Sequence, residues 1–281
     1  MPPPAPTRPL SEVAIEIAQT CLRHLDHTDA LADKAVVHEI RVATKRLRAA
    51  WHLVAEQAGT AHAKGRRRTL SGLSAKLAGT RELSVLTRLT LRLAAAVAND
   101  RGAAALNQVA IRLAQRHANA AHPGGNATDL YEDIREGLTA EIAAWRGLAH
   151  DDRPLRRRAV RRELGRSRRR ARRDARKTAH RRDADLWHDW RKAVNRLRYQ
   201  REFVAIAAGR EPRKFDTRLR RLGWRLGKCH DLANLVKFAA DLLAAGDLTT
   251  ADHRLVGKAI AVVESGLIRR WRRLAKRVFL R

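Results

Sequence analysis

Apolar residues recur every three or four positions along most of the chain, which is the period of an α-helix with one buried face. Ala, Leu and Arg dominate, whereas β-branched and aromatic residues are sparse. Gly, Pro and Asp interrupt the pattern at 58–65, 122–129, 150–154 and 207–211, where we expect loops. The pattern predicts an all-α protein with helices at 10–26, 33–58, 63–79, 81–98, 103–120, 129–148, 155–181, 185–208, 212–228, 231–245 and 250–279.

The helix expected at 33–58 carries a row of basic residues opposite its apolar stripe. At about 100° per residue, the spacing i, i+3, i+7, i+10 and i+14 places on one face His38, Arg41, Lys45, Arg48 and His52. Like charges at such spacings destabilise a helix by about 0.2–0.5 kcal/mol per pair. The row is therefore either a solvated face or the contact surface for an anion.

Two segments of the chain occur twice in the same order. The pattern HxxRxxxxRLR begins at His38 and again at His188, an offset of 150. KLAGTRELSVL at 76–86 and RLGKCHDLANL at 225–235 align at an offset of 149. Two blocks at nearly the same interval indicate an internal duplication. We predict one domain over 1–281, with a helical-bundle half at 10–122, a second half at 128–281 and a boundary near Gly124-Gly125.

The net charge of the chain narrows the class of binding partner. The chain has 59 Lys and Arg against 29 Asp and Glu, a formal net charge of +30 at pH 7, and most of the excess is Arg. This balance predicts a polyanionic partner: nucleic acid, an anionic membrane or an inorganic polyanion. Phosphate is the favoured anion because the guanidinium group binds phosphate oxygens in pairs. The segment 155–177, with Arg on nearly every side, is either a solvated arm or a helix that joins the basic rows.

Other features of the sequence exclude several classes of protein. Cys21 and Cys229 belong to no CxxC pair, which predicts two core residues in a reducing compartment. The start of the chain has no apolar signal region and no stretch approaches 18 apolar residues, so we expect a cytoplasmic protein without membrane contact. The chain shows no carboxylate cluster, glycine-rich P-loop or metal-ligand spacing. We therefore expect no catalytic residue, no metal site and no cofactor.

The doubled HxxRxxxxRLR, each copy followed after a similar interval by a Leu-x-x-x-[RH]-[ED]-Leu block, resembles the CHAD family, the conserved-histidine α-helical domain. The resemblance covers nearly the whole chain. It implies two antiparallel helical bundles related by a pseudo-twofold axis, with basic residues around a central groove or pore that holds inorganic polyphosphate. It also implies association with polyphosphate granules. CHAD domains often accompany a catalytic domain with an ExExK motif, which this chain lacks, so we expect no enzyme activity.

The resemblance assigns polyphosphate binding to both copies of the pattern. In the first half the matching positions are His38, Arg41, Lys45, Arg46 and Arg48, and in the second half they are His188, Arg191, Lys192, Arg196, Arg198 and Tyr199. Lys76 and Arg225 align between the second pair of blocks, and Arg173 aligns with Arg23, so these three residues join the predicted site. The two half-sites are not expected to be identical, because Asn195 aligns with Lys45.

Two alternative functions remain open. A general nucleic-acid-binding protein could use the 155–177 segment, and an enzyme could cleave or transfer phosphoryl groups. Single-stranded nucleic-acid binders interleave aromatic residues for base stacking, worth about 1–3 kcal/mol per base. Aromatic residues make up only 4% of this chain, and Trp51 and Trp190 fall on apolar helix faces. The sequence therefore favours polyphosphate over nucleic acid.

Overall fold

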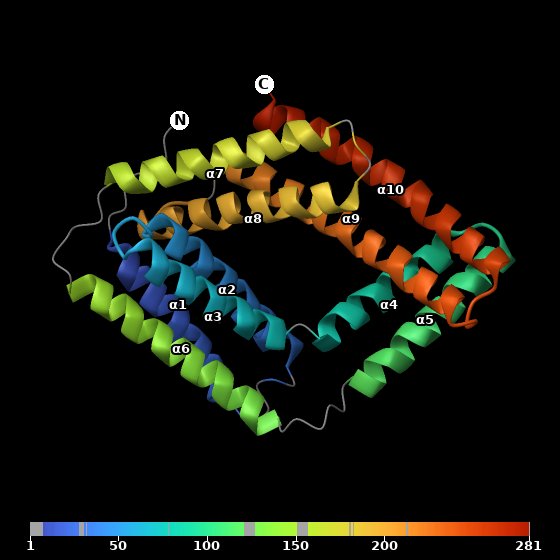
Figure 1. Cartoon of the computed structure of the whole chain (residues 1–281), viewed down its shortest axis with the longest axis horizontal. Coiled ribbons are helices and arrows are strands. Elements are labelled where there is room, and N and C mark those ends of the chain that lie inside the picture. The colour runs from blue at the N-terminus through green and yellow to red at the C-terminus, as the bar shows by residue number, and fades with distance from the viewer. Residues whose placement is uncertain are drawn as a thin grey trace. The chain divides into compact units, whose positions relative to one another are not determined.

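The computed structural model describes residues 8–27, 31, 33–77, 79–120, 127–150, 157–179, 181, 183–211 and 213–280. Within these ranges the chain forms α-helices and no strand (Figure 1), which confirms the predicted all-α class. The predicted boundary at Gly124-Gly125 and most of the expected loop at 150–154 lie outside the described residues. The helices are α1 (Leu10–Leu25), α2 (Lys34–Leu53), α3 (Thr60–Lys76), α4 (Gly79–Ala96), α5 (Asp100–Ala120), α6 (Ala127–His150), α7 (Arg157–Thr178), α8 (Ala184–Ala207), α9 (Lys214–Ala244) and α10 (Thr250–Phe279).

The prediction of separate helices at 212–228 and 231–245 is wrong, because both belong to α9. A single buried stripe crosses the expected break, formed by Leu226, Cys229, Leu232 and Leu235. Each of these residues is about one helical turn from the next, so the buried stripe runs without interruption and favours a continuous helix. The helix predicted at 33–58 also differs, since α2 ends at Leu53 and a short turn follows it.

Helix starts repeat at the spacing of the duplication. Asp33 caps α2 by accepting a hydrogen bond from the Ala35 backbone N–H, and Asp183, 150 residues later, accepts from the N–H groups of Asp185 and Leu186. Such caps satisfy backbone donors that have no partner inside the helix. The side chains of Asn99 and Thr249 accept from the backbone N–H three residues onward, and Gly59 and Gly209 both have positive φ. The duplication thus extends to local structure, whereas the pseudo-twofold relation stays a prediction.

The chain folds into two compact units, each built from three segments. Unit 1 comprises 1–77, 125–173 and 193–220, and unit 2 comprises 78–124, 174–192 and 221–281. Helices α7, α8 and α9 each contribute residues to both units. Each unit therefore combines residues from both halves of the duplicated sequence.

A buried carboxylate organises the core of unit 1. Here α1 packs on α2 and α6, and α3 packs on α2 and α6. The ring centroids of Trp51 (α2) and Trp145 (α6) are 4.3 Å apart, and both side chains are buried. Glu141 of α6 is also buried and accepts hydrogen bonds from both indole N–H groups and from the guanidinium group of Arg66 (α3). This network joins three helices.

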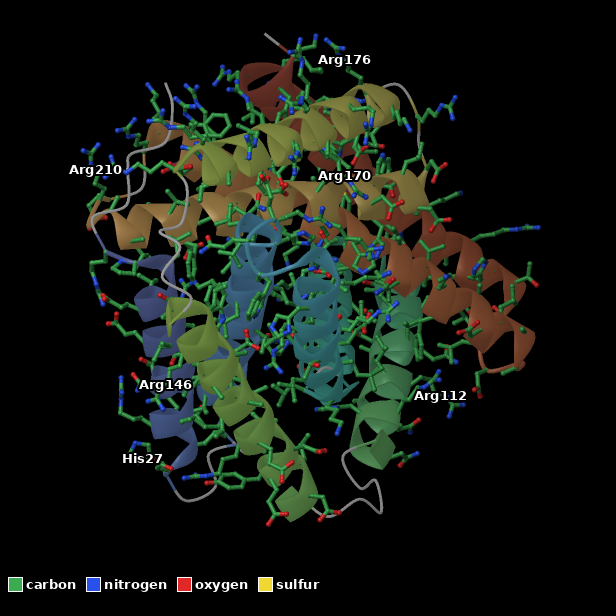
Figure 2. All side chains as sticks on the ribbon, turned by 60° about the vertical axis from the view of Figure 1, so that its left-hand side comes forward. His27, Arg112, Arg146, Arg170, Arg176 and Arg210 are labelled. Carbon is green, nitrogen blue, oxygen red and sulfur yellow. The ribbon has the colours of Figure 1, made fainter. Side chains whose placement is uncertain are left out.

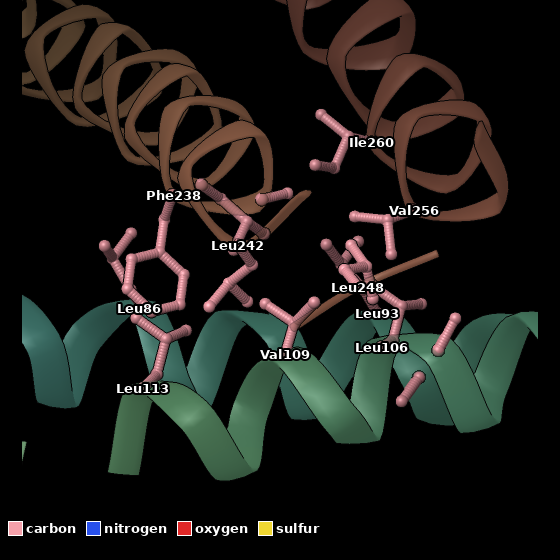
Figure 3. Close-up of a cluster of buried hydrophobic side chains, with 14 of the residues drawn as sticks. Leu86, Leu93, Leu106, Val109, Leu113, Phe238, Leu242, Leu248, Val256 and Ile260 are labelled. Carbon is pink, nitrogen blue, oxygen red and sulfur yellow. The ribbon is translucent and has the colours of Figure 1, made fainter. Parts of the chain in front are cut away.

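The core of unit 2 is apolar and drawn from four helices. Figure 3 shows leucine side chains of α4 and α5 in contact with side chains of α9 and α10. Removing each such side chain from water contributes about 1.5–3 kcal/mol. The members include Leu86, Leu93, Leu106, Val109, Leu113, Phe238, Leu242, Val256 and Ile260.

The basic segment at 155–177 is a packed helix over its described residues, 157–177, and not a solvated arm. Val160, Leu164, Ala171 and Ala175 of α7 are buried, with Ser167 between them on the same face. Their spacing of three or four residues produces one buried stripe, and the arginines occupy the remaining surface. The stripe fixes which arginines of α7 face neighbouring helices.

Candidate anion-binding site

Basic side chains from four helices converge in unit 1. Arg48 and His52 lie on α2, Arg67 on α3, Arg170 on α7 and Arg196 on α8, and all except Arg170 are half-buried. Figure 2 labels Arg170 on α7. Burial lowers the pKa of Arg196, and the charges of Arg170, Arg67 and Arg48 lower it further. We term these five residues the basic cluster.

His52 is neutral within the basic cluster at neutral pH. Burial lowers its pKa to about 3, and the charges of Arg196, Arg67, Arg48 and Arg170 act in the same direction. Burial also lowers the pKa values of Arg48 and Arg67. Burial disfavours the charged form of a basic side chain because that form loses hydration, and neighbouring cations disfavour it because like charges repel. The cluster is therefore a place where an added anion would be stabilised.

Glu163 of α7 opposes part of this repulsion, since its charge raises the pKa values of Arg67 and Arg196. Its carboxylate also accepts hydrogen bonds from Ser167 at 3.3 Å and from Arg166 at 3.4 Å. This carboxylate therefore offsets part of the charge of Arg67 and Arg196. The basic cluster keeps a strongly positive character.

A second basic site lies in unit 2, around two stacked histidines. The ring centroids of His188 (α8) and His230 (α9) are 4.6 Å apart. Burial lowers the pKa of His230 to about 4, and the charges of Arg191, His188, Lys192 and Lys237 add to this effect. The pKa of His188 is lowered by burial and then by Lys192 and Arg191. His188 thus resists protonation, because its charged form would lose hydration and meet like charges.

Each basic row packs against the motif block that follows it in sequence. Arg41 Nη1 donates a hydrogen bond to the backbone C=O of Leu77 at 2.6 Å in unit 1. In unit 2, 150 residues later, a Cβ added to Gly227 would lie 3.9 Å from Arg191 Nε. The two arginines therefore occupy equivalent positions in their units.

Other predicted site residues form ion pairs. Arg46 bonds Glu202 of α8, with its Nε 3.0 Å from the carboxylate. Lys76 pairs with Asp133 of α6. The Lys192 ammonium lies 3.2 Å from Asp189, one turn earlier on α8. Neither Arg46 nor Lys76 belongs to the basic cluster, and a role for these residues in binding stays a prediction.

The remaining predicted residues are placed separately. The guanidinium carbon of Arg198 lies 4.0 Å from the ring centroid of Tyr199, whose phenol is buried and has a pKa raised by that burial. Arg225 of α9 donates to the backbone C=O of Arg270 at 3.2 Å. Three further residues complete the set: His38 and Arg173 are exposed, and Lys45 is half-buried.

Arg67 and Arg170 are the members of the basic cluster that sequence reasoning missed. Arg67 is one helical turn from both Ala63 and Leu70, which are buried on α3. This spacing places Arg67 on the apolar face of its helix and could have identified it. Arg170 precedes the buried Ala171, but several arginines of α7 adjoin the buried stripe, so the sequence does not single it out.

Cys21 and Cys229 are buried and free, as predicted for core residues, and burial raises the pKa of each thiol to about 12. Among the described residues, no group of three or more His, Cys, Asp or Glu side chains is arranged to hold a metal ion. Within the described part of the chain, every helix is too short or too polar to cross a membrane.

Comparison with known proteins identifies a family. The model of the CHAD domain matches residues 16–240. PptA from Streptomyces chartreusis has a similar structure, with a TM-score of 0.68, 17% identity and coverage of 97% of this chain and 98% of that chain. The CHAD domain from the plant Ricinus communis has a TM-score of 0.65, with 19% identity and coverage of 97% and 93%. These two likenesses show a shared fold. No curated protein matches the chain.

Proposed function

This chain belongs to the CHAD domain family, and from that premise we propose that it binds inorganic polyphosphate without catalysing a reaction. The observation that carries the proposal is the basic cluster, in which burial and three neighbouring arginines lower the pKa of Arg196. Four helices supply these side chains, so the fold holds like charges together against their repulsion.

Polyphosphate matches such a site chemically. It carries charge on every phosphate and has no bases, so a receptor needs guanidinium groups and little stacking surface. An anion that enters the basic cluster relieves repulsion among Arg48, Arg67, Arg170 and Arg196. Half-buried charges are also screened less by salt than charges in open solvent. The cluster should therefore contribute more to affinity than an equal number of exposed arginines.

We also propose that this binding places the protein at polyphosphate granules. The proposal of binding without catalysis is supported by the sequence, which has neither an ExExK motif nor a glycine-rich P-loop. The second basic site, around His188 and His230, would supply further contacts to the same kind of ligand.

A matched pair of double variants tests the basic cluster. Arg67→Gln with Arg170→Gln removes two cluster charges, whereas Arg68→Gln with Arg169→Gln removes two charges from adjacent, exposed positions of the same helices, α3 and α7. By analogy with nucleic acids, each lost phosphate contact should reduce the slope of log affinity against log salt by about 0.9. The cluster variant should therefore lose about 2 units of slope and most of the affinity for long-chain polyphosphate, measured by calorimetry.

The control variant should retain nearly the wild-type slope and affinity. Equal losses in the two variants would mean that net charge alone governs binding, and the proposed site would be wrong. Circular dichroism of both variants checks that the helices are intact.

Competition with duplex DNA tests the alternative of general nucleic-acid binding. Both polymers are supplied at equal concentrations of phosphate charge. We expect long-chain polyphosphate to displace duplex DNA, because the basic cluster is half-buried and a flexible chain reaches it more easily than a rigid helix does. Preferential retention of DNA would favour the alternative.

A further inference from the structure

Trp224 of α9 differs from the other tryptophans of the chain. Its side chain is 61% exposed, whereas the other five are at most 4% exposed. A single exposed apolar residue is ordinary on protein surfaces and has no meaning alone. The surroundings of Trp224 decide whether the indole has a function.

Three cations of α9 lie beside Trp224. Arg221, Arg225 and Lys228 are three residues before, one residue after and four residues after it, so they lie along one face of α9. The Lys228 ammonium is 6.0 Å from the centroid of the indole ring. An exposed aromatic surface with positive charge beside it results.

Helix α10 adds further positive charge. Burial lowers the pKa of Arg225, and the charges of Arg270, Arg221 and Arg273 lower it further. The hydrogen bond from Arg225 to the Arg270 backbone joins α9 to α10 at this point. We term the set the tryptophan strip; it consists of Arg221, Trp224, Arg225, Lys228, Arg270 and Arg273.

The chemistry of the strip differs from that of the basic cluster. Polyphosphate has no aromatic group and gains nothing from an exposed indole. Duplex nucleic acid keeps its base faces stacked inside the helix. A single strand offers both parts, because its bases stack on aromatic side chains while basic groups contact the adjoining phosphates. The combination of indole and guanidinium groups fits this ligand.

We propose that the tryptophan strip binds single-stranded nucleic acid, with one base stacked on Trp224 and the neighbouring phosphates held by the arginines of α9 and α10. This activity goes beyond polyphosphate binding and uses an aromatic residue that polyphosphate does not require. It distinguishes single strands from duplex DNA, which a general basic surface does not.

The test compares two strands of equal length and charge, an oligoadenylate and an abasic oligomer that lacks bases. Binding is followed by fluorescence anisotropy of a dye on the strand. The wild-type protein should bind the oligoadenylate about 5- to 150-fold more tightly, the range expected from one stacked base. Trp224→Ala should remove this preference and leave the affinity for the abasic strand unchanged. Trp224→Phe should keep part of it.

Val236→Ala is the matched control, because Val236 is also an exposed apolar residue of α9. This variant should show the wild-type preference for the oligoadenylate over the abasic strand. Equal wild-type affinity for the two strands would overturn the proposal, as would a preference that survives Trp224→Ala. Binding of adenosine triphosphate as tight as that of the oligoadenylate would assign the strip to free nucleotides instead.

Polyphosphate binding is measured in the same variants. Trp224→Ala should leave it unchanged, and the pair Arg67→Gln and Arg170→Gln should leave the preference for bases unchanged. The experiments thus distinguish a failure of polyphosphate binding at the basic cluster from a failure of single-strand binding at the tryptophan strip. A thermal melt of Trp224→Ala shows whether the fold is retained. If this variant does not fold, Trp224→Phe is used in its place.

Discussion

Replacing Glu141 by Gln removes one negative charge from the interior of unit 1 and leaves the shape of the side chain unchanged. Glu141 accepts from the Trp145 indole at 2.9 Å and also from the Trp51 indole. Its other oxygen accepts from Arg66 Nε at 3.1 Å and from Arg66 Nη2 at 2.6 Å. A Gln at this position would direct an amide N–H₂ at groups that only donate hydrogen bonds.

The expected loss follows from burial. The Glu141 side chain is 0% exposed and that of Arg66 is 17% exposed. Removing one partner of a buried ion pair costs about 3–5 kcal/mol, because the other charge stays buried without compensation. The residual exposure of Arg66 places the cost near the lower end, about 3 kcal/mol. At about 2–4 °C per kcal/mol for a domain of 150–250 residues, Tm should fall by about 6–12 °C.

Glu56→Gln provides the control. Glu56 pairs with Arg162, and both side chains are 53% exposed, so the loss should be about 0–1 kcal/mol. Urea unfolding followed by circular dichroism measures both variants. The double variant Arg66→Gln with Glu141→Gln removes both buried charges and should be more stable than Glu141→Gln alone. If Glu141→Gln unfolds like Glu56→Gln, or if the double variant is less stable than the single one, a buried charge left without compensation is not the cause of the loss.

Two further predictions concern pH and helix capping. The folded-state pKa of His52, about 3, lies below its ordinary value of 6.5, so the unfolded chain takes up the proton first and stability should fall as the pH falls between these values. His52→Gln should flatten this decline by up to about 1.4 kcal/mol per pH unit in urea unfolding, and an unchanged curve would contradict a neutral His52. Asp33→Ala and Asp183→Ala should each cost about 1 kcal/mol, because each removes an N-cap, and thermal melts should show losses larger than that of the exposed Asp189→Ala.

Much of the fold could be predicted from the sequence because helical periodicity and helix ends are local properties. The period of the apolar residues fixes which face of α2 or α7 is buried, and caps such as Asp183 mark where helices begin. The break expected between 228 and 231 was wrong because the buried stripe of α9 continues across it. The assembly of two compact units from interleaved segments depends on contacts between distant residues, which no local pattern encodes.

The basic cluster could be predicted only in part for the same reason. Arg48 and Arg196 stand out because the duplicated motif repeats them. Arg67 is one of three consecutive arginines, and only the packing of α3 decides that Arg66 reaches Glu141 while Arg67 joins the cluster. The motif also contains a residue that does not belong to the basic cluster, because Arg46 pairs with Glu202. The spacing of a motif predicts which helix face its side chains occupy, whereas tertiary packing decides which partner they meet there.

The carboxylates of unit 1 explain how the fold tolerates such a site. Glu141 joins α6 to α3 through Arg66, and Glu202 joins α8 to α2 through Arg46, so each pair fixes a helix that also carries a member of the basic cluster. Acidic groups placed in this way stabilise the packing and leave the neighbouring cluster strongly positive. The chain has 59 basic and 29 acidic residues, so the positions of the acidic residues decide where positive charge accumulates. Burial and the repulsion of Arg170, Arg67 and Arg48 lower the pKa of Arg196. That repulsion is a free energy that the fold must offset, and an anion that entered the cluster would recover it as affinity.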